Sequence, residues 1–155
     1  MPPGDDVISS LREALKLSRD NLPLRQHLAE QLLAGGRAEE ASEEFKTALS
    51  ARPDDAKLKI GLATAYYQQG KNSTAMVIVE DLVKGRDCPA KATLLYARLL
   101  LRAGDVERAV RQYKKAVEAD PQLADIELAS RLGVRAEPGG ADEQDEAPRA
   151  VVDGI

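Results

Sequence analysis

The feature that most constrains this chain is a set of small residues that recurs every 34 positions. Three consecutive segments, which begin at Leu22, Ala56 and Ala90, align without a gap. The eighth position holds Ala29, Ala63 and Ala97. The fifteenth holds Gly36, Gly70 and Gly104, and the twentieth holds Ala41, Ala75 and Ala109. Position 32 is a proline in the first and third segments, Pro53 and Pro121. A fixed period of this length is typical of architectures in which one supersecondary unit is stacked repeatedly.

Each recurring residue has a mechanical reason. Glycine at position 15 lets the chain reverse at the end of a helix, because it adopts a left-handed conformation without a Cβ penalty. Alanine at positions 8 and 20 allows two facing helix axes to approach to the short end of about 8–10 Å. Larger apolar residues fall on the inward stripes of these helices, namely Leu28, Leu32, Phe45, Leu62, Tyr66, Val79, Tyr96, Leu100 and Tyr113. Each segment is therefore predicted to form a helical hairpin.

This pattern resembles the tetratricopeptide repeat, which has the same period and the same small residues at positions 8, 15, 20 and 27. The resemblance covers three full repeats, from Leu22 to Leu123. Position 4, which is often tryptophan in the family, is Arg25, Lys59 and Thr93 here. The resemblance implies an all-α fold, a right-handed superhelical array of antiparallel helical hairpins with about eight helices.

The resemblance also divides the chain. Residues 1–21 form an N-terminal half repeat, 22–55, 56–89 and 90–123 the three repeats, 124–135 a capping helix and 136–155 an acidic tail or linker. The N-terminal helix presents Val7, Leu11, Ala14 and Leu15 inward, and the capping helix presents Leu123, Ile126, Leu128 and Leu132. The tail is predicted to be disordered, because it has too little apolar surface to offset its ordering entropy.

Composition excludes several classes of function. The net charge is −4, but it is unevenly distributed, because residues 137–155 hold six acids and one base. The other residues hold 21 bases and 20 acids and are therefore nearly neutral. This balance gives no indication of nucleic-acid binding. Cys88 is the only cysteine and His27 the only histidine, which excludes a disulfide within the chain, a histidine dyad and a multi-histidine metal site. We therefore expect no enzyme activity, no catalytic residue, no cofactor and no metal. Neither a leader nor a long apolar run is present, which predicts a cytoplasmic protein.

In the resembling family the first helix of each hairpin lines a concave groove. Here its positions are Pro23, Gln26, His27, Glu30, Leu33, Ala34, Lys57, Ile60, Gly61, Thr64, Tyr67, Gln68, Lys91, Leu94, Leu95, Arg98, Leu101 and Arg102. We expect partner contacts from Lys57, Ile60, Thr64, Tyr67, Lys91, Leu94, Leu95, Arg98, Leu101 and Arg102. The apolar floor and the basic cluster predict a protein or peptide with apolar anchors and acidic flanks. Alternatively, Leu95 and Leu101 simply contact the neighbouring repeat.

The leading hypothesis is a non-catalytic protein–protein interaction module, a scaffold or adaptor. Some family members clamp a C-terminal carboxylate, but only Lys91 matches their five clamp positions, so this role is excluded. An alternative is an N-terminal recruitment or self-assembly domain of a larger multidomain protein, such as an AAA-type ATPase. A further hypothesis is that the acidic tail, through Val151 and Val152, occupies its own groove or that of a neighbour in a homo-oligomer.

Overall fold

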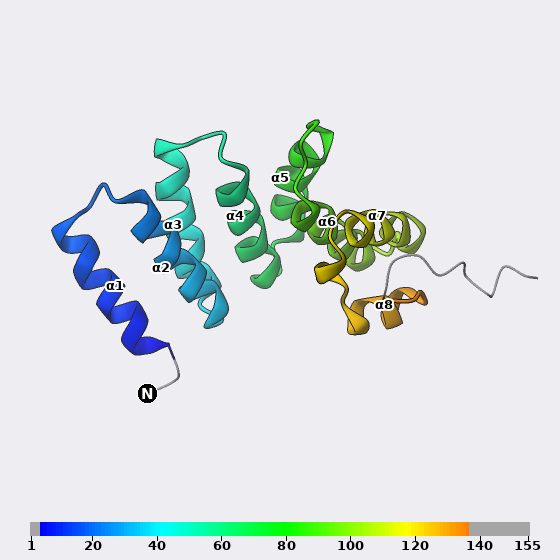
Figure 1. The fold of residues 1–155 in the computed structure, drawn as a ribbon, viewed down its shortest axis with the longest axis horizontal. Coiled ribbons are helices and arrows are strands. Elements are labelled where there is room, and N and C mark those ends of the chain that lie inside the picture. The colour runs from blue at the N-terminus through cyan, green and yellow to red at the C-terminus, as the bar shows by residue number, and fades with distance from the viewer. Residues whose placement is uncertain (1–3, 137–155) are drawn as a thin grey trace, which may run out of the picture.

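The structure is a computed structural model that describes residues 4–136, and every regular element in this part of the chain is helical (Figure 1). The elements are α1 (Asp5–Leu17), α2 (Leu22–Ala34), α3 (Ala38–Ala51), α4 (Ala56–Gln68), α5 (Asn72–Lys84), α6 (Ala90–Arg102), α7 (Val106–Ala119), the 3-10 turn η1 (Pro121–Leu123) and α8 (Ile126–Leu132). The predicted all-α array is confirmed. Helices α2 and α3, α4 and α5, and α6 and α7 form its three hairpins.

The helices are stacked in chain order. Each helix from α1 to α7 packs on its neighbours in the sequence, and α4 also contacts α2 on one side and α6 on the other. We call these three helices the inner row. In Figure 1, α1 to α5 run close to the plane of the picture, whereas α6 and α7 are seen nearly end-on. The stack therefore twists along its length, as expected when each repeat is rotated slightly against the one before it.

The three hairpin turns share one hydrogen-bonding pattern. Gly36, Gly70 and Gly104 have φ angles of 76°, 75° and 84°, in the left-handed region. At the first turn the N–H of Arg37 donates to the carbonyl of Leu32 at 2.8 Å, and the equivalent bond is 2.9 Å at the other two turns. This is the helix-ending motif in which a left-handed residue lets a following N–H satisfy an otherwise unpaired carbonyl. The glycines of position 15 thus do what the sequence predicted.

Helix starts are set by capping side chains more than by prolines. The side chains of Asn21 and Asp55 accept hydrogen bonds from the backbone N–H groups three residues later, at 3.0 and 3.1 Å, and so begin α2 and α4. Pro53 lies in the loop before Asp55, and Pro121 opens the 3-10 turn η1 instead of a long helix. Proline therefore keeps the preceding helix from continuing, while asparagine and aspartate fix where the next one begins.

The core is continuous along the stack. The position-8 alanines Ala29, Ala63 and Ala97 are each 0 % exposed, so the helix axes do approach closely at these residues. One buried cluster covers α1 to α4 and a second covers α4 to α8. Tyr66 and Ile78 pack against both clusters. Each repeat consequently shares its apolar surface with the next, and no repeat has a separate core.

Charged side chains tie the first three helices together. Glu40 of α3 pairs with Arg12 of α1 and with Arg37, the latter at 2.7 Å. Glu44 pairs with Arg25 of α2 at 2.6 Å, with both side chains largely buried. The hydrogen bond from Arg37 lowers the pKa of Glu40. Glu40 and Glu44 therefore link α3 to α1 and α2.

Two predicted core positions at the ends of the array are wrong. Val7 is 43 % exposed, and Ile8 beside it is 3 % exposed and packs toward α2. In a complete repeat the residue at the position of Val7 would face the first helix of the hairpin. No helix precedes α1 within the described residues, so Val7 has no such helix to cover it. Ile126 is 81 % exposed, because α8 begins at this residue and turns Leu128 and Leu132 inward instead. The predicted disordered tail lies outside the described residues.

Candidate partner-binding groove

Two adjoining hollows run along the inner row. The first has a volume of about 530 Å³ and lies between α2, α4 and the start of α6. The second has a volume of about 660 Å³ and lies between α4, α6 and the segment from η1 to the start of α8. Ile60, Thr64 and Lys91 line both hollows. We call the two hollows together the groove.

Most of the predicted partner-contact residues line the groove. Lys57 lies in the first hollow, and Leu94, Leu95 and Arg98 lie in the second. Of the positions expected from the first repeat, Glu30 and Leu33 line the first hollow. Tyr67, Leu101 and Arg102 line a smaller cleft against α8, which adjoins the second hollow at Arg98, Asp125 and Glu127. That these residues contact a partner stays a prediction.

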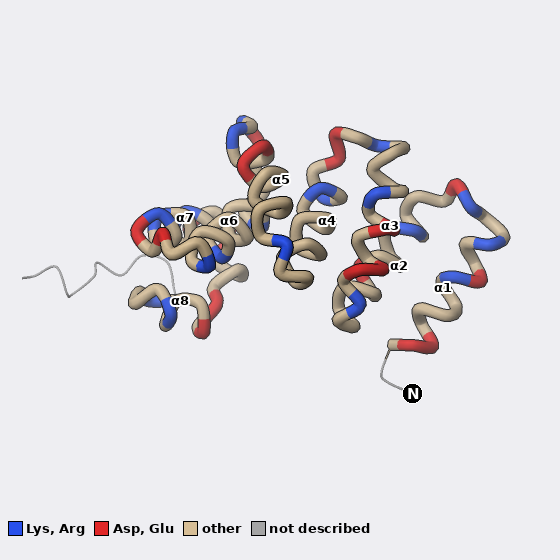
Figure 2. Tube along the Cα trace, turned by 180° about the vertical axis from the view of Figure 1, so that it is seen from behind, with Lys and Arg blue, Asp and Glu red and all other residues tan. Residues whose placement is uncertain are grey.

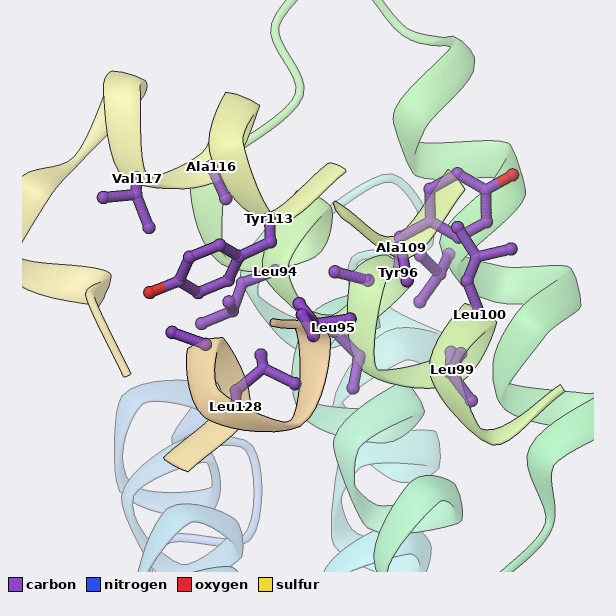
Figure 3. Close-up of a cluster of buried hydrophobic side chains, with 14 of the residues drawn as sticks. Leu94, Leu95, Tyr96, Leu99, Leu100, Ala109, Tyr113, Ala116, Val117 and Leu128 are labelled. Carbon is purple, nitrogen blue, oxygen red and sulfur yellow. The ribbon is translucent and has the colours of Figure 1, made fainter. Parts of the chain in front are cut away.

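The leucines expected on the groove floor are largely withdrawn from solvent. Leu94 and Leu95 are 7 % and 4 % exposed. In Figure 3, Leu128 of α8 points toward both of them, and the ring of Tyr113 lies beside Leu94. Both leucines therefore stabilise the packing of α6 against its neighbours, and little of their surface is left for a partner.

Arg102 is held by the preceding repeat. Its guanidinium lies 3.4 Å from the centroid of the Tyr67 ring, and its Nη1 donates to the Tyr67 carbonyl at 2.8 Å and to Asn72 Oδ1 at 3.0 Å. Stacking and charge-assisted hydrogen bonds of this kind fix an arginine in one orientation. Arg102 therefore joins the second repeat to the third, and it does not belong to the basic cluster of the groove.

Gly61 shapes the floor of the first hollow. A Cβ atom at this position would lie 2.3 Å from Cε1 and 2.4 Å from Cζ of Phe45. The ring of Phe45 comes from α3, is 1 % exposed and fills the space that a side chain on α4 would need. The bare backbone of Gly61 and the edge of this ring therefore form an apolar floor between Lys57 and Leu33.

One wall of the groove was not predicted. Leu123, Asp125, Ile126 and Glu127, from η1 and the start of α8, line the second hollow. Asp125 Oδ2 accepts a hydrogen bond from Arg98 Nη2 at 2.8 Å, and its Oδ1 caps α8 by accepting from the Leu128 N–H at 3.0 Å. The sequence signal that could have predicted this wall is Asp125 itself, because an aspartate directly before a short apolar run commonly caps the start of a helix.

The charges of the groove follow an order that the sequence did not indicate. Lys57 and Lys91 are exposed and have no ion pair to a described residue, whereas Arg98 is neutralised by Asp125. Glu30 lies at the α2 end, Asp120 lines the first hollow together with the start of α6, and Asp125 and Glu127 lie at the α8 end. Figure 2 shows the same mixture over residues 4–136, in which neither sign forms a continuous stripe. The groove is thus mixed in charge: Lys57 and Lys91 lie near its middle, and acids lie at both ends and, at Asp120, in the first hollow.

Asp125 makes the attachment of α8 sensitive to acid. The hydrogen bond from the Leu128 N–H, followed by that from Arg98, lowers the pKa of Asp125 below its ordinary value of 3.8. A lowered folded-state pKa means that the stabilisation is complete above this ordinary value and is lost as the pH falls through the lowered one.

We expect Asp125→Asn, which retains the cap but removes the charge, to weaken α8 by up to about 1 kcal/mol at neutral pH. Hydrogen exchange of the Leu128 amide should show this difference from wild type above pH 4 and lose it at lower pH. A difference that stayed constant into acid would contradict the role of the Asp125 charge.

A further hollow lies outside the groove. It has a volume of about 690 Å³, lies between α3, α4 and α5, and is lined by Lys46, Leu49, Ser50, Pro53, Lys59, Leu62, Val77, Ile78 and Asp81. We call it the outer hollow. Val77 at its edge is 70 % exposed. Both lysines of the outer hollow are already paired, Lys46 with Glu43 at 2.8 Å and Lys59 with Asp81 at 3.7 Å.

Two further searches concern membrane spans and metal sites. None of the helices within residues 4–136 is long and apolar enough to cross a membrane. Over the same residues, no three side chains of histidine, cysteine, aspartate or glutamate gather in a way that could hold a metal ion.

Comparison with known proteins identifies the repeat. Models of the tetratricopeptide repeat match residues 4–55, 32–87 and 90–132. Cellulose synthase operon protein C of Xanthomonas axonopodis pv. citri (strain 306) is 32 % identical over 108 residues, which are 66 % of this chain and 7 % of that protein. The chain thus spans a small part of that relative.

Solved structures share the fold. A tetratricopeptide repeat protein from Parabacteroides merdae ATCC 43184 superposes with a TM-score of 0.70 at 23 % identity, over 81 % of this chain and 48 % of that one. MamA from Desulfovibrio magneticus RS-1 (residues 41 to the end) superposes with a TM-score of 0.69 at 18 % identity, over 85 % of this chain and 73 % of that one. From these matches, the chain belongs to the tetratricopeptide repeat family, whose repeats are protein–protein interaction modules.

Proposed function

We propose that this protein is a non-catalytic scaffold that binds a short segment of a partner protein in the groove of the inner row. The observation that carries the proposal is the pair Lys57 and Lys91, which stand exposed beside the apolar floor of Gly61 and Phe45. Apolar contacts supply most of the affinity of such sites, and a few placed charges fix the orientation of the bound segment.

The charge order of the groove refines the expected partner. An acidic residue of the bound segment would lie over Lys57 and Lys91, and basic residues would lie toward Glu30 at one end and Glu127 at the other. An aliphatic side chain next to the acidic residue would rest on Gly61 and Phe45. The acid of the partner segment is therefore expected over the two lysines and away from Asp120, and not on both flanks, because further acids of the groove lie at its ends.

Selection of peptides from a random display library on the full chain tests this proposal. We expect the selected peptides to share an aliphatic residue next to an acidic one. Lys57→Glu with Lys91→Glu should weaken their binding by about tenfold or more, measured by fluorescence polarisation, because two attractive charge contacts become repulsive.

The controls separate the groove from general charge and from the outer hollow. Arg52→Glu with Lys115→Glu changes the net charge equally at two exposed positions outside the groove, and should leave affinity within about twofold. Val77→Asp introduces a charge at the outer hollow and should also have little effect. Peptides that lost binding in the Val77 variant but not in the lysine variant would overturn the assignment to the groove.

A second candidate is that the array is the recruitment domain of a larger multidomain protein. The observation in its favour is that the chain matches only 7 % of one relative and 48 % of a structural neighbour. An antibody raised against the array would then detect a polypeptide far longer than 155 residues in the source cells. A band at the size of the present chain would contradict this candidate.

A further inference from the structure

We propose that the acidic segment of this chain, residues 142–153, binds in the groove of the same chain and competes with the partner. The inference rests on the proposed function of the groove and adds a means of regulation. Its basis is threefold: the place where the chain leaves the described structure, the order of charges along the groove, and the order of charges in the segment.

The chain leaves the described residues beside the groove. Tyr113 Oη donates to the carbonyl of Ala136, the last described residue, at 2.9 Å. The same hydroxyl accepts the backbone N–H of Asp125 at 3.2 Å. Asp125 lines the second hollow of the groove. The hydroxyl of Tyr113 thus links Ala136 to Asp125 in the groove wall, so the chain leaves the described residues close to the groove.

The length of chain after Ala136 is sufficient to reach the lysines. Five residues lie between Ala136 and Asp142, which makes six residue steps, and the five include Pro138, Gly139 and Gly140, residue types that favour chain reversal. An extended chain covers about 3.3 Å per residue, so six residues span about 20 Å. Adjacent helices pack about 8–10 Å apart, so this span is enough to cross from α8 over α6.

Part of the charge order of the segment matches that of the groove. From the α8 end toward the α2 end, the groove presents Glu127 and the Arg98–Asp125 pair, then Lys91 and Lys57 with Asp120 in the same hollow, and then Glu30. The segment presents the acids of residues 142–146, then one base, Arg149, and then Asp153. The match is between the first acids and the two lysines, and between Arg149 and Glu30. About five residues of extended chain separate the acids from the base, roughly 15 Å, which is of the order of the spacing from α4 to α2.

Val151 and Val152 follow Arg149 and are the first pair of adjacent branched aliphatic residues in the segment. They would rest near Leu33 at the α2 end of the groove. Tethering strengthens such a contact, because a short flexible connection holds the segment at an effective concentration on the order of 1 mM. A segment with an intrinsic Kd of about 0.1–1 mM would then reduce the affinity of an outside peptide by about two- to tenfold.

The single cysteine offers a direct test in the full chain. Cys88 directly precedes Pro89, which lines the first hollow, so a spin label on its sulfur reports on the groove. We expect the label to broaden the amide NMR signals of residues 142–153. Lys57→Glu with Lys91→Glu should abolish the broadening, and Arg52→Glu with Lys115→Glu should not. Absence of broadening in the wild type would overturn the proposal.

A mixture of isotope-labelled and spin-labelled molecules distinguishes one chain from two. Broadening should be absent when the isotope and the spin label are carried by different molecules. Broadening in this mixture would place the segment in the groove of a second copy, and would overturn binding within one chain.

Competition measures the consequence for the partner site. Neutralising Asp142, Glu143, Asp145 and Glu146 to their amides in the full chain should raise the affinity of a library-selected groove peptide by about two- to tenfold. Unchanged affinity would overturn the competition. If selected peptides still bind in a lysine-dependent way, only this inference fails. If no peptide binds the groove at all, the proposed function fails with it.

Discussion

Ala63→Glu is expected to unfold the array, with a loss of more than about 4 kcal/mol in the free energy of unfolding. Ala63 is 0 % exposed on α4, and Ala75, its partner position on α5, is also 0 % exposed. A glutamate here must either bury a carboxylate without a partner or force the two helices apart. Because repeat stability depends on the interface with each neighbour, the damage should spread beyond one hairpin.

Urea denaturation followed by circular dichroism gives the measurement. Gln68→Glu is the matched control, since it introduces the same side chain on the same helix at an exposed position. This control should remain within about 0.5 kcal/mol of wild type. An Ala63→Glu variant that kept its helicity and its denaturation midpoint would mean that small residues do not set the distance between these helices.

The fold could be predicted because its determinants are local and repeated. Glycine at position 15 dictates a left-handed turn wherever it occurs, so Gly36, Gly70 and Gly104 each fix a hairpin without reference to the rest of the chain. The buried alanines act in the same way, because a small residue facing a small residue has the same consequence in every repeat. Agreement of several such positions in one register left few alternative folds.

The ends of the array could not be predicted in the same way. Val7 was placed inward by carrying the repeat register back beyond the first complete repeat, and Ile126 by the apolar stripe of the expected capping helix. A register predicts burial only where the neighbouring helix exists to cover the residue. On α1 that neighbour is absent among the described residues, so Ile8 packs instead. After α7 the register breaks at η1, and α8 presents Leu128 inward.

The composition of the groove depended on contacts between repeats. The family resemblance placed Lys57, Ile60, Thr64 and Lys91 on the side of the groove, and all four line its first hollow. It did not predict which exposed positions another helix would cover, because coverage depends on the twist between repeats.

Arg98 illustrates this limit. It was expected to be a free base, and it is instead paired with an aspartate that is 27 residues away in the sequence. No pattern within a single repeat contains such a pair.

Gly61→Ala should be destabilising by about 2–3 kcal/mol, although helix propensity alone would favour alanine by about 1 kcal/mol. The opposing term is steric. The new methyl group would lie 2.3 Å from Cε1 of Phe45, and that ring is 1 % exposed and enclosed by the core. Either the ring or the helix must move, and both movements disturb the contact between the first and second repeats.

Gly35→Ala provides the control for propensity. Gly35 has a φ of −81°, and a Cβ atom there would meet only two backbone oxygens, at 3.4 and 3.7 Å. This substitution should therefore be neutral or stabilising by up to about 1 kcal/mol, because alanine loses less chain entropy on folding. The two glycine substitutions are thus expected to change the midpoint of thermal unfolding in opposite directions.

A double-mutant cycle identifies Phe45 as the cause. Phe45→Leu alone should cost stability through the cavity that it creates. Combined with Gly61→Ala, it makes room for the new methyl group, so the double variant should be more stable than the sum of the two losses by about 1 kcal/mol or more. If the two losses of stability simply add, the Phe45 ring is not the group that a side chain at residue 61 would meet. The steric explanation for Gly61 in the floor of the groove would then be wrong.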